Sequence, residues 1–587
     1  MKRTLRMMLA VLVWVASACA QTLDGLETFV AEQMKEWKVP GVALVVVKDG
    51  QIIHSKGYGF RNLKDQLPVT PKTLFAIGSS TKAFTAITLA QLVDDGKLDW
   101  DKPVRDYLPD FRLYDQTATE RLTPRDLVSH RSGLPRHDLM WYSAPFTRDQ
   151  LYQRLRYLEP SKDIRTTFQY QNLMFMTAGY LAGRLQDMPW EDAVRRRIFQ
   201  PLGMTASGFS VSEMQKAPDY ALPYKKNKEE VVEAAFRNID AIGPAGSINS
   251  NIEDMAKYLL MNLNGGKLGD KQVLSKAQAD QTKTVQMPIA SQGRWTELGP
   301  SSYGMGWMLT TYHGHSLVHH GGNIDGFSAL VTFMPRDQTG MVILTNMNGS
   351  ALPGLISYNV YDRLLSLDQI PWTQRLRDDE KKAKEGEEEA KKKQYTAQRA
   401  GTRPSHELKE YAGDYEHPGY GTLKIAANGD ELEMTLHGLR SRLKHFHYDV
   451  FEGVEDPLNP LSKSKVQFHT SLEGFVESAG LPVDVVLKPQ IFRKVAGREM
   501  RQRSFLEPMT GEYAFGPVTA TVSMQGDDTL TLLVPGQPRY ELVPVEGARF
   551  QLKGLTAFSV EFKKGPSGAY EEAVFHQPNG TFAARRK

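Results

Sequence analysis

The stretch GVALVVVKDGQIIHSKGY, residues 41–58, decides how the fold begins. Two apolar runs, Gly41–Val47 and Gln51–Tyr58, flank the turn Lys48-Asp49-Gly50. Asp-Gly between apolar runs is a strong signal for a β-hairpin with a tight turn. Both runs are apolar enough for central strands, which are buried on both faces. The stretch therefore predicts an antiparallel hairpin in the middle of a sheet.

Strand signals return much later in the chain, in Phe327–Met334 and Gly340–Thr345. The hydrophobic pattern between the two strand-forming regions is mainly helical. The predicted helices are Ser80–Asp95, Pro124–Ser129, Leu173–Leu185 and Asn251–Asn264. Strands at both ends with helices between them predict an α/β domain over residues 21–370, in which one antiparallel sheet, built from both ends of the domain, is flanked by helices.

A charged segment follows this domain, and we expect residues 371–403 to form a helical linker. Between Arg375 and Lys393, 15 of 19 residues are charged. Pairs such as Glu380 and Lys384 place an acid four residues before a base, which stabilises an exposed helix. A solvated helix is the simplest interpretation of such a run.

The last part of the chain contains an internal repeat. The sequence YAGDY at residues 411–415 is echoed by MTGEY at residues 509–513. A β-rich segment with turn residues follows each copy. We therefore expect two small antiparallel β-barrel-like modules, residues 404–500 and 501–587, because a closed barrel leaves no free strand edge.

The tetrapeptide SSTK, residues 79–82, follows an apolar stretch and Gly78 at the predicted start of a helix. A backbone N–H at a helix start can stabilise an oxyanion. Lys82 lies one turn further on the same helix face. Its amine can take the Ser79 proton if burial or a nearby cation lowers its pKa from roughly 10.4. The pattern alone is weak, because serine is also a common helix N-cap.

Two further motifs accompany the serine and the lysine. Tyr170-Gln171-Asn172 precedes a predicted helix, and His319-His320-Gly321-Gly322 enters a predicted strand. In this order the motifs resemble S-x-x-K, Y-x-N and K/H-x-G of the penicillin-recognising serine hydrolases. That family contains class C β-lactamases, D-amino-acid peptidases of the peptidase S12 type and related esterases. The resemblance covers residues 26–365 and includes the stretches 75–79, 122–134, 201–204 and 243–247.

The resemblance implies a β-lactamase-like fold for the domain over residues 21–370 and a role for each matching residue. Ser79 would be acylated, and Lys82 and Tyr170 would share the proton transfers as a coupled pair. The backbone N–H groups of Ser79 and Gly322 would form the oxyanion hole. The other predicted site residues are His319, as a fourth catalytic residue, and Asn172, His320 and Gly321, as substrate-binding residues. Asn172 would also orient Lys82.

His319 stands where β-lactamases and transpeptidases of the family mostly carry lysine. An imidazole with a pKa of about 6.5 is a weaker anion anchor at neutral pH. The sequence therefore favours a serine hydrolase that acts through an acyl-enzyme on D-residue peptides or small esters. Two alternatives stay open. One is a β-lactamase or cell-wall D,D-carboxypeptidase, and the other is a catalytically degraded binding protein.

The predicted mechanism needs no cofactor, and we expect no metal site. The histidines at 313, 315, 319 and 320 have no neighbouring Asp or Glu, and His445, His447 and Asp449 fit the polar face of a strand. The expected partner is a small-molecule or peptide substrate. A net charge of +4 gives no electrostatic footprint for nucleic acid. No pattern in the sequence specifies an oligomeric state.

Residues 1–20 have the pattern of an export signal. A basic start is followed by an apolar run, and Ala18-Cys19-Ala20 fits a cleavage site. Cys19 also suits a lipid anchor, but the preceding residues lack the usual leucine, so plain secretion is favoured. No later stretch reaches the roughly 18 apolar residues that span a bilayer. We therefore expect an exported protein, periplasmic or extracellular, without a membrane span.

Overall fold

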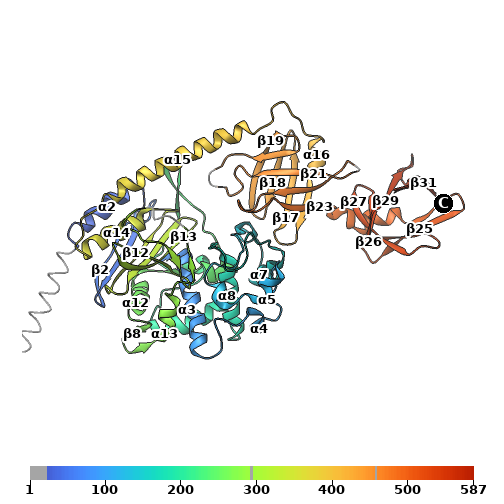
Figure 1. The fold of residues 1–587 in the computed structure, drawn as a ribbon. Coiled ribbons are helices and arrows are strands. Elements are labelled where there is room, and N and C mark those ends of the chain that lie inside the picture. The colour runs from blue at the N-terminus through green and yellow to red at the C-terminus, as the bar shows by residue number, and fades with distance from the viewer. Residues whose placement is uncertain (1–22, 291–294, 457–458, 473) are drawn as a thin grey trace, which may run out of the picture. The chain divides into compact units, whose positions relative to one another are not determined.

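The computed structural model describes residues 23–290, 295–456, 459–472 and 474–587 of the 587-residue chain (Figure 1). These residues form two compact units. The first unit comprises the described residues up to Ala397 together with Val483–Lys488, and the second comprises Gln398–Pro482 together with Pro489–Lys587. The predicted signal peptide, residues 1–20, lies outside the described residues.

Within the described residues, a nine-stranded antiparallel sheet forms the centre of the first unit, in the order β10-β11-β12-β13-β14-β15-β1-β2-β3. β1 (Gly41–Lys48) pairs with both β15 (Thr339–Thr345) and β2 (Gln51–Asn62). The prediction of one sheet built from both ends of the domain is therefore confirmed. The other strands of this sheet are β3 (Leu67–Pro68), β10 (Met287–Pro288), β11 (Ser302–Tyr303), β12 (Met308–Tyr312), β13 (His315–Ile324) and β14 (Phe327–Met334).

The two strands of the predicted hairpin differ in burial. Every residue of β1 from Gly41 to Val47 is buried, as expected for a central strand. β2 is partly exposed along its whole length. Its outer neighbour, β3, has only two residues and pairs near one end of β2. The prediction that both strands are central was therefore wrong for β2, because β2 lies almost at the sheet edge.

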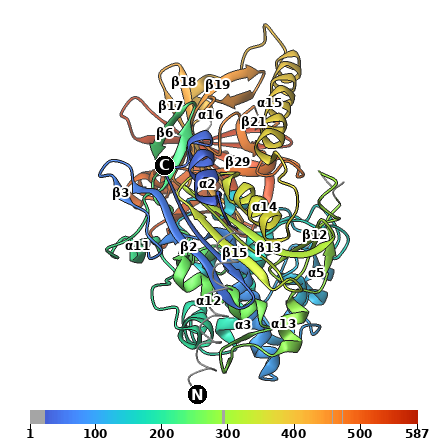
Figure 2. The same ribbon diagram turned by 90° about the vertical axis from the view of Figure 1, so that its left-hand side faces the viewer.

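Helices cover both faces of the sheet (Figure 2). α2 (Leu26–Glu36) and α14 (Leu352–Leu364) share one apolar core with the side chains of Val42, Leu44 and Val46. α12 (Ile252–Leu263) contacts β1 and β15 outside that core, so it covers the opposite face. The remaining helices of the first unit are α4 (Val104–Tyr107), α5 (Gln116–Arg121), α6 (Pro124–Leu127), α7 (Arg148–Arg154), α9 (Trp190–Val194), α10 (Gln200–Leu202), α11 (Val211–Met214), α13 (Lys276–Thr282) and those introduced below.

The helix that follows the SSTK serine is enclosed on all sides. The short 3-10 turn η1 (Gly78–Ser80) leads into α3 (Thr81–Asp94), in which 12 of 14 residues are buried. α3 contacts α8 (Asn172–Arg184), α13 and the 3-10 segment η5 (Asp240–Ala245). The four predicted helices of this region thus correspond to α3, α6, α8 and α12, with ends that differ by at most two residues.

The charged segment forms the helix α15 (Trp372–Thr396), as predicted. Its first turns pack against the end of α2. The Arg377 guanidinium donates to the Glu36 carboxylate at 2.6 Å and lies 4.5 Å from the Trp37 ring. Gly386 and its neighbours from Lys381 to Ala390 are exposed, which agrees with a solvated helix.

In the described part of the second unit, two closed antiparallel barrels of eight strands each follow one another. β16 pairs with β23 to close the first barrel, and β24 pairs with β31 to close the second. The predicted β-barrel modules are therefore confirmed. The first barrel comprises β16 (Gly413–His417), β17 (Gly421–Asn428), β18 (Glu431–Leu436), β19 (Leu439–His447), β20 (Val450–Gly453), β21 (Lys465–Thr470), β22 (Val476–Leu481) and β23 (Gln490–Val495).

The second barrel repeats this arrangement. It comprises β24 (Gly511–Phe515), β25 (Val518–Gln525), β26 (Thr529–Leu533), β27 (Arg539–Glu546), β28 (Arg549–Leu552), β29 (Leu555–Lys564), β30 (Tyr570–Gln577) and β31 (Gly580–Arg586). The repeated sequence has the same structural role in both barrels. Buried Tyr415 donates its hydroxyl to Tyr411 O at 2.7 Å, and buried Tyr513 donates to Met509 O at 2.8 Å. A short helix precedes each first strand, α16 (Leu408–Tyr411) and α17 (Arg503–Leu506).

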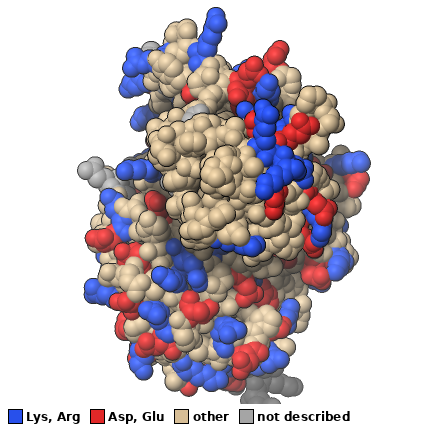
Figure 3. Space-filling model, turned by 90° about the vertical axis from the view of Figure 1, so that its right-hand side faces the viewer, with Lys and Arg blue, Asp and Glu red and all other residues tan. Residues whose placement is uncertain are grey.

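Two global properties bear on function. Among the residues that the structure describes, no helix is both long and apolar enough to cross a membrane. On the face seen in Figure 3, Lys and Arg are interspersed with Asp and Glu. This mixture accompanies a net charge of only +4.

Candidate active site

Ser79 lies in η1, which packs against β13. Gly78 has a φ of +52°, and a Cβ at this position would lie 2.8 Å from the backbone nitrogen of Asn323. A Cβ on Gly322 would lie 1.9 Å from the carbonyl oxygen of Ile77. Glycine is therefore required at both positions, because two backbones approach closely there. This approach sets the Ser79 turn directly against β13.

The Lys82 amine is fully buried and has three hydrogen-bond partners. Its Nζ lies 2.9 Å from Ser79 Oγ, 2.8 Å from Asn172 Oδ1 and 2.8 Å from the carbonyl oxygen of Ala245. A neutral amine donates its two N–H groups to the amide and carbonyl oxygens and accepts from the Ser79 hydroxyl. All three partners are uncharged. The amine is thus placed to exchange a proton with Ser79.

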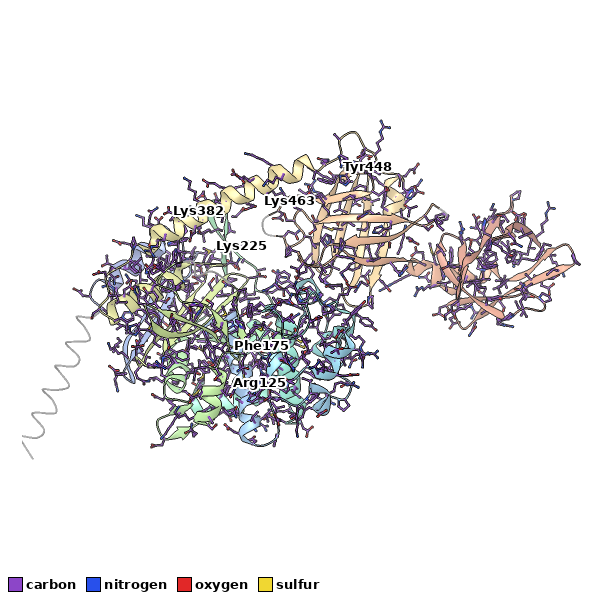
Figure 4. All side chains as sticks on the ribbon, viewed as in Figure 1. Arg125, Phe175, Lys225, Lys382, Tyr448 and Lys463 are labelled. Atoms are coloured by element: carbon purple, nitrogen blue, oxygen red, sulfur yellow. The ribbon has the colours of Figure 1, made fainter. Side chains whose placement is uncertain are left out.

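Burial lowers the pKa of Lys82 well below its usual value, because a desolvated ammonium has no counter-ion in contact. The positive charge of Arg136 lowers this pKa further, and the negative charge of Asp138 raises it. Phe175, labelled in Figure 4, adds an apolar wall, with its ring centre 5.5 Å from Lys82 Nζ. The site therefore favours a neutral lysine.

Tyr170 completes the group around the serine. Its ring centre lies 4.8 Å from Lys82 Nζ. Burial raises the pKa of Tyr170, although a hydrogen bond with the Ser79 side chain acts in the opposite direction. The tyrosine therefore keeps its proton at neutral pH. Of the two groups predicted to share the proton transfers, Lys82 is the one prepared to act as a base.

The two histidines of the third motif lie on opposite faces of β13, as strand alternation requires. His320 is 3% exposed, and its ring centre lies 6.3 Å from that of Tyr170. His319 lies on the other face, and its cross-strand partners are Met308 and Thr332. The structure thus brings His320, rather than His319, next to Tyr170.

His320 is held in a neutral form. Its Nδ1 donates to Gly321 O at 2.6 Å, since a carbonyl oxygen only accepts. Its Nε2 therefore accepts from the Tyr303 hydroxyl at 3.0 Å. Burial lowers the pKa of His320 to about 3. At neutral pH this imidazole carries no charge and does not attract an anion as a cation would.

The strand register decides which backbone N–H of β13 faces the serine. β12 and β13 are joined by His313 and Gly314, whose φ values of +47° and +85° are those of a type I′ turn. The pair that flanks such a turn, Tyr312 and His315, directs its backbone groups toward each other. Backbone groups then alternate along β13, whose pairing shows no register shift. Beyond the end of β12, the open edge therefore carries the N–H of Asn323, while that of Gly322 faces β14.

This register changes the expected oxyanion hole. The prediction named the N–H groups of Ser79 and Gly322, but the geometry places the N–H of Asn323 at the open edge beside η1. Gly322 instead provides the space into which the Ile77 carbonyl oxygen fits. Gly321 also lies at the open edge, where it is exposed to a substrate.

Sequence reasoning missed several residues that surround the site. Buried His130 accepts at Nδ1 from the Gln171 N–H at 3.0 Å, and its ring centre lies 4.2 Å from that of Tyr170. Its position within the stretch 122–134 was the available signal. Arg136 lies with its guanidinium carbon 5.2 Å from the Tyr170 ring centre, and Asp138 accepts from Asn172. These two residues lie in a loop without a periodic pattern, so no sequence signal marked them.

The histidine clusters considered for metal binding have other partners. His445 Nε2 donates to Tyr448 O at 2.8 Å, and Asp449 accepts from Ser405. His315 Nδ1 is hydrogen-bonded to Asp337 Oδ1 at 2.8 Å. Over the ranges that the structure describes, no group of three or more His, Cys, Asp or Glu is arranged to hold a metal ion.

A serine beside a buried lysine with a lowered pKa and a protonated tyrosine, at the edge of a helix-covered antiparallel sheet, defines a penicillin-recognising type of serine hydrolase. Comparison with known proteins agrees with this class. The chain belongs to the beta-lactamase family, whose model ("Beta-lactamase") matches residues 26–358. A second model, "Domain of unknown function (DUF3471)", matches residues 397–496, which include the first barrel.

Relatives of known name extend this result. "Unguisins hydrolase ungD'" of Aspergillus campestris (strain IBT 28561) is 32% identical over 430 residues, 68% of this chain and 78% of that protein. "Putative penicillin-binding protein PbpX" of Bacillus subtilis (strain 168) is 27% identical over 337 residues, 57% of this chain and 78% of that protein. The structure of the octameric penicillin-binding protein homologue from Pyrococcus abyssi superposes with a TM-score of 0.54 at 24% identity. The superposition covers 80% of this chain and 100% of the Pyrococcus abyssi chain, which shows that the two proteins share the fold.

Proposed function

We propose that this protein is an exported hydrolase of the class C-related, peptidase S12 type that cleaves amide or ester bonds through an acyl-enzyme on Ser79. The observation that carries the proposal is the buried Lys82 amine, which has a lowered pKa and lies 2.9 Å from Ser79 Oγ. A neutral amine at this distance is a general base for the serine hydroxyl. The pattern of residues 1–20 supports export.

Acylation follows from the positions of the groups. Neutral Lys82 takes the Ser79 proton while Oγ bonds to the substrate carbonyl carbon. The N–H groups of Ser79 and Asn323 stabilise the oxyanion that forms. The Tyr170 hydroxyl gives its proton to the leaving amine or alkoxide, and the Lys82 ammonium returns a proton to Tyr170. The C–N or C–O bond breaks, and Ser79 carries the acyl group.

Deacylation uses the same groups in reverse. Lys82 is again neutral after the leaving group departs, and it takes a proton from a water molecule, directly or through Tyr170. The hydroxide attacks the ester carbonyl, with the charge on the same two N–H groups. The proton then passes to Ser79 Oγ as the ester bond breaks. The free acid and the starting enzyme result.

The neutral state of His320 supports D-residue peptides or small esters as substrates. A substrate carboxylate would find no cation at this strand position, since the pKa of His320 is about 3. The alternative of a β-lactamase or D,D-carboxypeptidase is favoured by one other observation. The Arg136 side chain is 51% exposed beside Tyr170 and could bind a substrate carboxylate. The catalytically degraded alternative is disfavoured by the intact Ser79, Lys82 and Tyr170.

A direct comparison of substrates tests the proposal. A chromogenic cephalosporin, a D-alanine anilide and a short-chain nitrophenyl ester are assayed with wild type and with Ser79→Ala. We expect the anilide or the ester to dominate, and the variant to lose about 10⁶-fold in kcat, as in other serine hydrolases without their nucleophile. Equal turnover by both proteins would overturn the assignment, and a dominant cephalosporin would make the alternative correct.

A mass measurement supplies an independent readout. A slowly hydrolysed ester should add one acyl group to wild type, and peptide mapping should place it on Ser79. Ser79→Ala should gain no mass. An acyl group on another residue would contradict the mechanism even if turnover were observed.

A further inference from the structure

Asp138 lies at the start of the 3-10 turn η2 (Asp138–Met140), beside the catalytic group. Both of its carboxylate oxygens accept hydrogen bonds. Oδ1 accepts from Trp141 Nε1 at 2.9 Å and from Asn172 Nδ2 at 3.2 Å. Oδ2 accepts from Arg136 Nε at 2.6 Å. The Arg136 guanidinium thus holds one carboxylate oxygen, and the Trp141 indole and the Asn172 amide share the other.

We propose that Asp138 is a positioning residue of the active site, which fixes the side-chain amide of Asn172 so that its oxygen faces Lys82. This inference rests on the proposed function of Ser79 and Lys82. It assigns to Asp138 an effect on turnover although it touches neither the nucleophile nor the base.

The argument depends on what each group can donate or accept. An asparagine amide has one donor end and one acceptor end, and a carboxylate only accepts. Asp138 therefore selects the orientation in which Asn172 turns Nδ2 toward it. The same orientation places Asn172 Oδ1 2.8 Å from Lys82 Nζ. In the flipped orientation, an N–H group would point at the lysine amine, which would lose one of its two acceptors.

Arg136 and Asp138 also act on Lys82 through their charges. The titratable and charged groups around the amine are Tyr170, His130 and His320, which are neutral, and this ion pair. Arg136 lowers the pKa of Lys82 and Asp138 raises it. Loss of either residue therefore shifts the pKa of Lys82 in a known direction.

Substitution of Asp138 and substitution of Arg136 should shift the pH profile of kcat/KM in opposite directions. The acid limb of kcat/KM reports the essential base of the free enzyme, which is neutral Lys82 here. Asp138→Asn removes the anion, so the pKa of Lys82 falls and the limb moves to lower pH. Arg136→Gln removes the cation, so the limb moves to higher pH. Because both side chains are partly exposed, we expect shifts of about 0.3–1 pH unit.

The experiment compares four variants with wild type, with a nitrophenyl ester as substrate. Asp138→Asn should lower kcat about 10- to 100-fold, the usual effect of losing an orienting partner, and change KM less than about threefold. Asp138→Glu keeps an acceptor-only group and should recover part of kcat. Asp101→Asn is the matched control, because Asp101 pairs with Arg125 at 2.7 Å on the surface of the same domain and should leave both kcat and the pH profile unchanged.

The outcomes separate the inference from the proposed function. If wild type shows no turnover that depends on Ser79, the proposed function fails and this inference fails with it. If wild type is active but Asp138→Asn matches it in kcat and in pH profile, only the positioning role is overturned. The positioning role is also overturned if Asp138→Asn only lowers the thermal stability, while the pH profile of kcat/KM of the folded molecules stays the same as in wild type. If Asp138→Asn does not fold, the test uses Arg136→Gln, whose acid limb of kcat/KM is expected to move to higher pH. If that limb does not move, the inference is overturned.

Discussion

Two fully buried ionisable residues of the first unit, Lys82 in α3 and Asp126 in α6, have opposite surroundings. Asp126 accepts from Arg131 at 2.5 Å and from Arg165 at 2.8 Å. It also closes the capping box with Thr123 at the start of α6. Lys82 has three hydrogen-bond partners within 2.9 Å, and none of them is charged.

The difference appears in the pKa values. Burial alone would raise the pKa of Asp126, but the hydrogen bond from Arg165 and the charge of Arg131 outweigh burial and lower it. The negative charge of Asp138 does not outweigh the burial of Lys82, and the pKa of Lys82 falls. A buried charge with counter-ions stabilises the fold, whereas a buried amine among neutral acceptors is kept reactive. Four predictions test this distinction.

The largest effect is expected for Lys82→Met. The variant keeps the length of the side chain but loses the base, so kcat/KM for the ester should fall about 10³- to 10⁴-fold. The free energy of unfolding should stay the same or rise, because an apolar replacement of a buried ionisable group is often neutral or stabilising. Kinetics and urea unfolding at pH 7 measure the two quantities. A strongly destabilised variant would show that Lys82 has mainly a structural role.

Asp126→Asn should show the reverse pattern. Loss of the carboxylate leaves the guanidinium groups of Arg131 and Arg165 without their counter-ion, which destabilises the fold by about 3 kcal/mol. Activity per folded molecule should be unchanged, since Asp126 does not contact the catalytic group. Urea unfolding and active-site titration check this. A tenfold fall in kcat of the folded enzyme would argue against the separation of roles.

The two residues should also affect stability in different pH ranges. The folded pKa of Asp126 is lowered, so its stabilisation is present above the unfolded pKa of about 3.9 and is lost as the pH falls through the folded pKa. The lowered pKa of Lys82 means that the unfolded chain binds more protons up to about pH 10.4, so stability rises with pH over that range.

Unfolding curves of wild type and both variants between pH 3 and pH 10 measure these differences. The stability gap between wild type and Asp126→Asn should shrink below about pH 4. Relative to Lys82→Met, wild type should gain stability as the pH rises above neutral. If the stabilities of wild type and Lys82→Met change in parallel with pH, the folded and the unfolded chain bind the Lys82 proton equally, which would contradict the prediction.

The smallest effect concerns a neutral buried group in the second barrel. Tyr513→Phe removes the hydroxyl that donates to Met509 O, which should destabilise this barrel by about 1 kcal/mol. Hydrogen exchange of the amides in β24 and β31 measures the change. Tyr157→Phe is the control, because Tyr157 is 42% exposed and should have no effect. Equal exchange in wild type and Tyr513→Phe would show that a satisfied neutral group contributes nothing here.

The sequence was a sound guide to elements with strong local signals. The hairpin at Lys48-Asp49-Gly50, the four helices and the two barrels follow from turn residues, periodicity and the repeat. The exposure of β2 could not be predicted, because it depends on the two-residue length of β3 rather than on β2 itself. The motifs located Ser79 and Lys82, which the structure brings to 2.9 Å.

Sequence reasoning placed some site residues differently because their orientation depends on which residues of β13 face which side. His320 replaces His319 beside Tyr170, and Asn323 replaces Gly322 at the open edge, because side chains and backbone groups alternate along β13. The type I′ turn at His313 and Gly314 sets which residues of β13 direct their backbone groups toward β12. A His-Gly pair is a weaker turn signal than Asn-Gly, so the register was not evident. Asp138 and Arg136 lie in an irregular loop, where only the folded chain shows their contacts.

The enclosure of α3 has a consequence for how such a site can change over time. A helix with 12 of 14 residues buried cannot shift without disturbing every element around it, so the position of Ser79 is a fixed point of the molecule. New substrates must therefore be accommodated by the segments that border the serine, such as the loop that carries Arg136 and Asp138. Substitutions there alter selectivity at little expense to the fold, whereas changes within α3 threaten both. Natural variation and directed evolution should accordingly concentrate in that loop while the nucleophile remains in place.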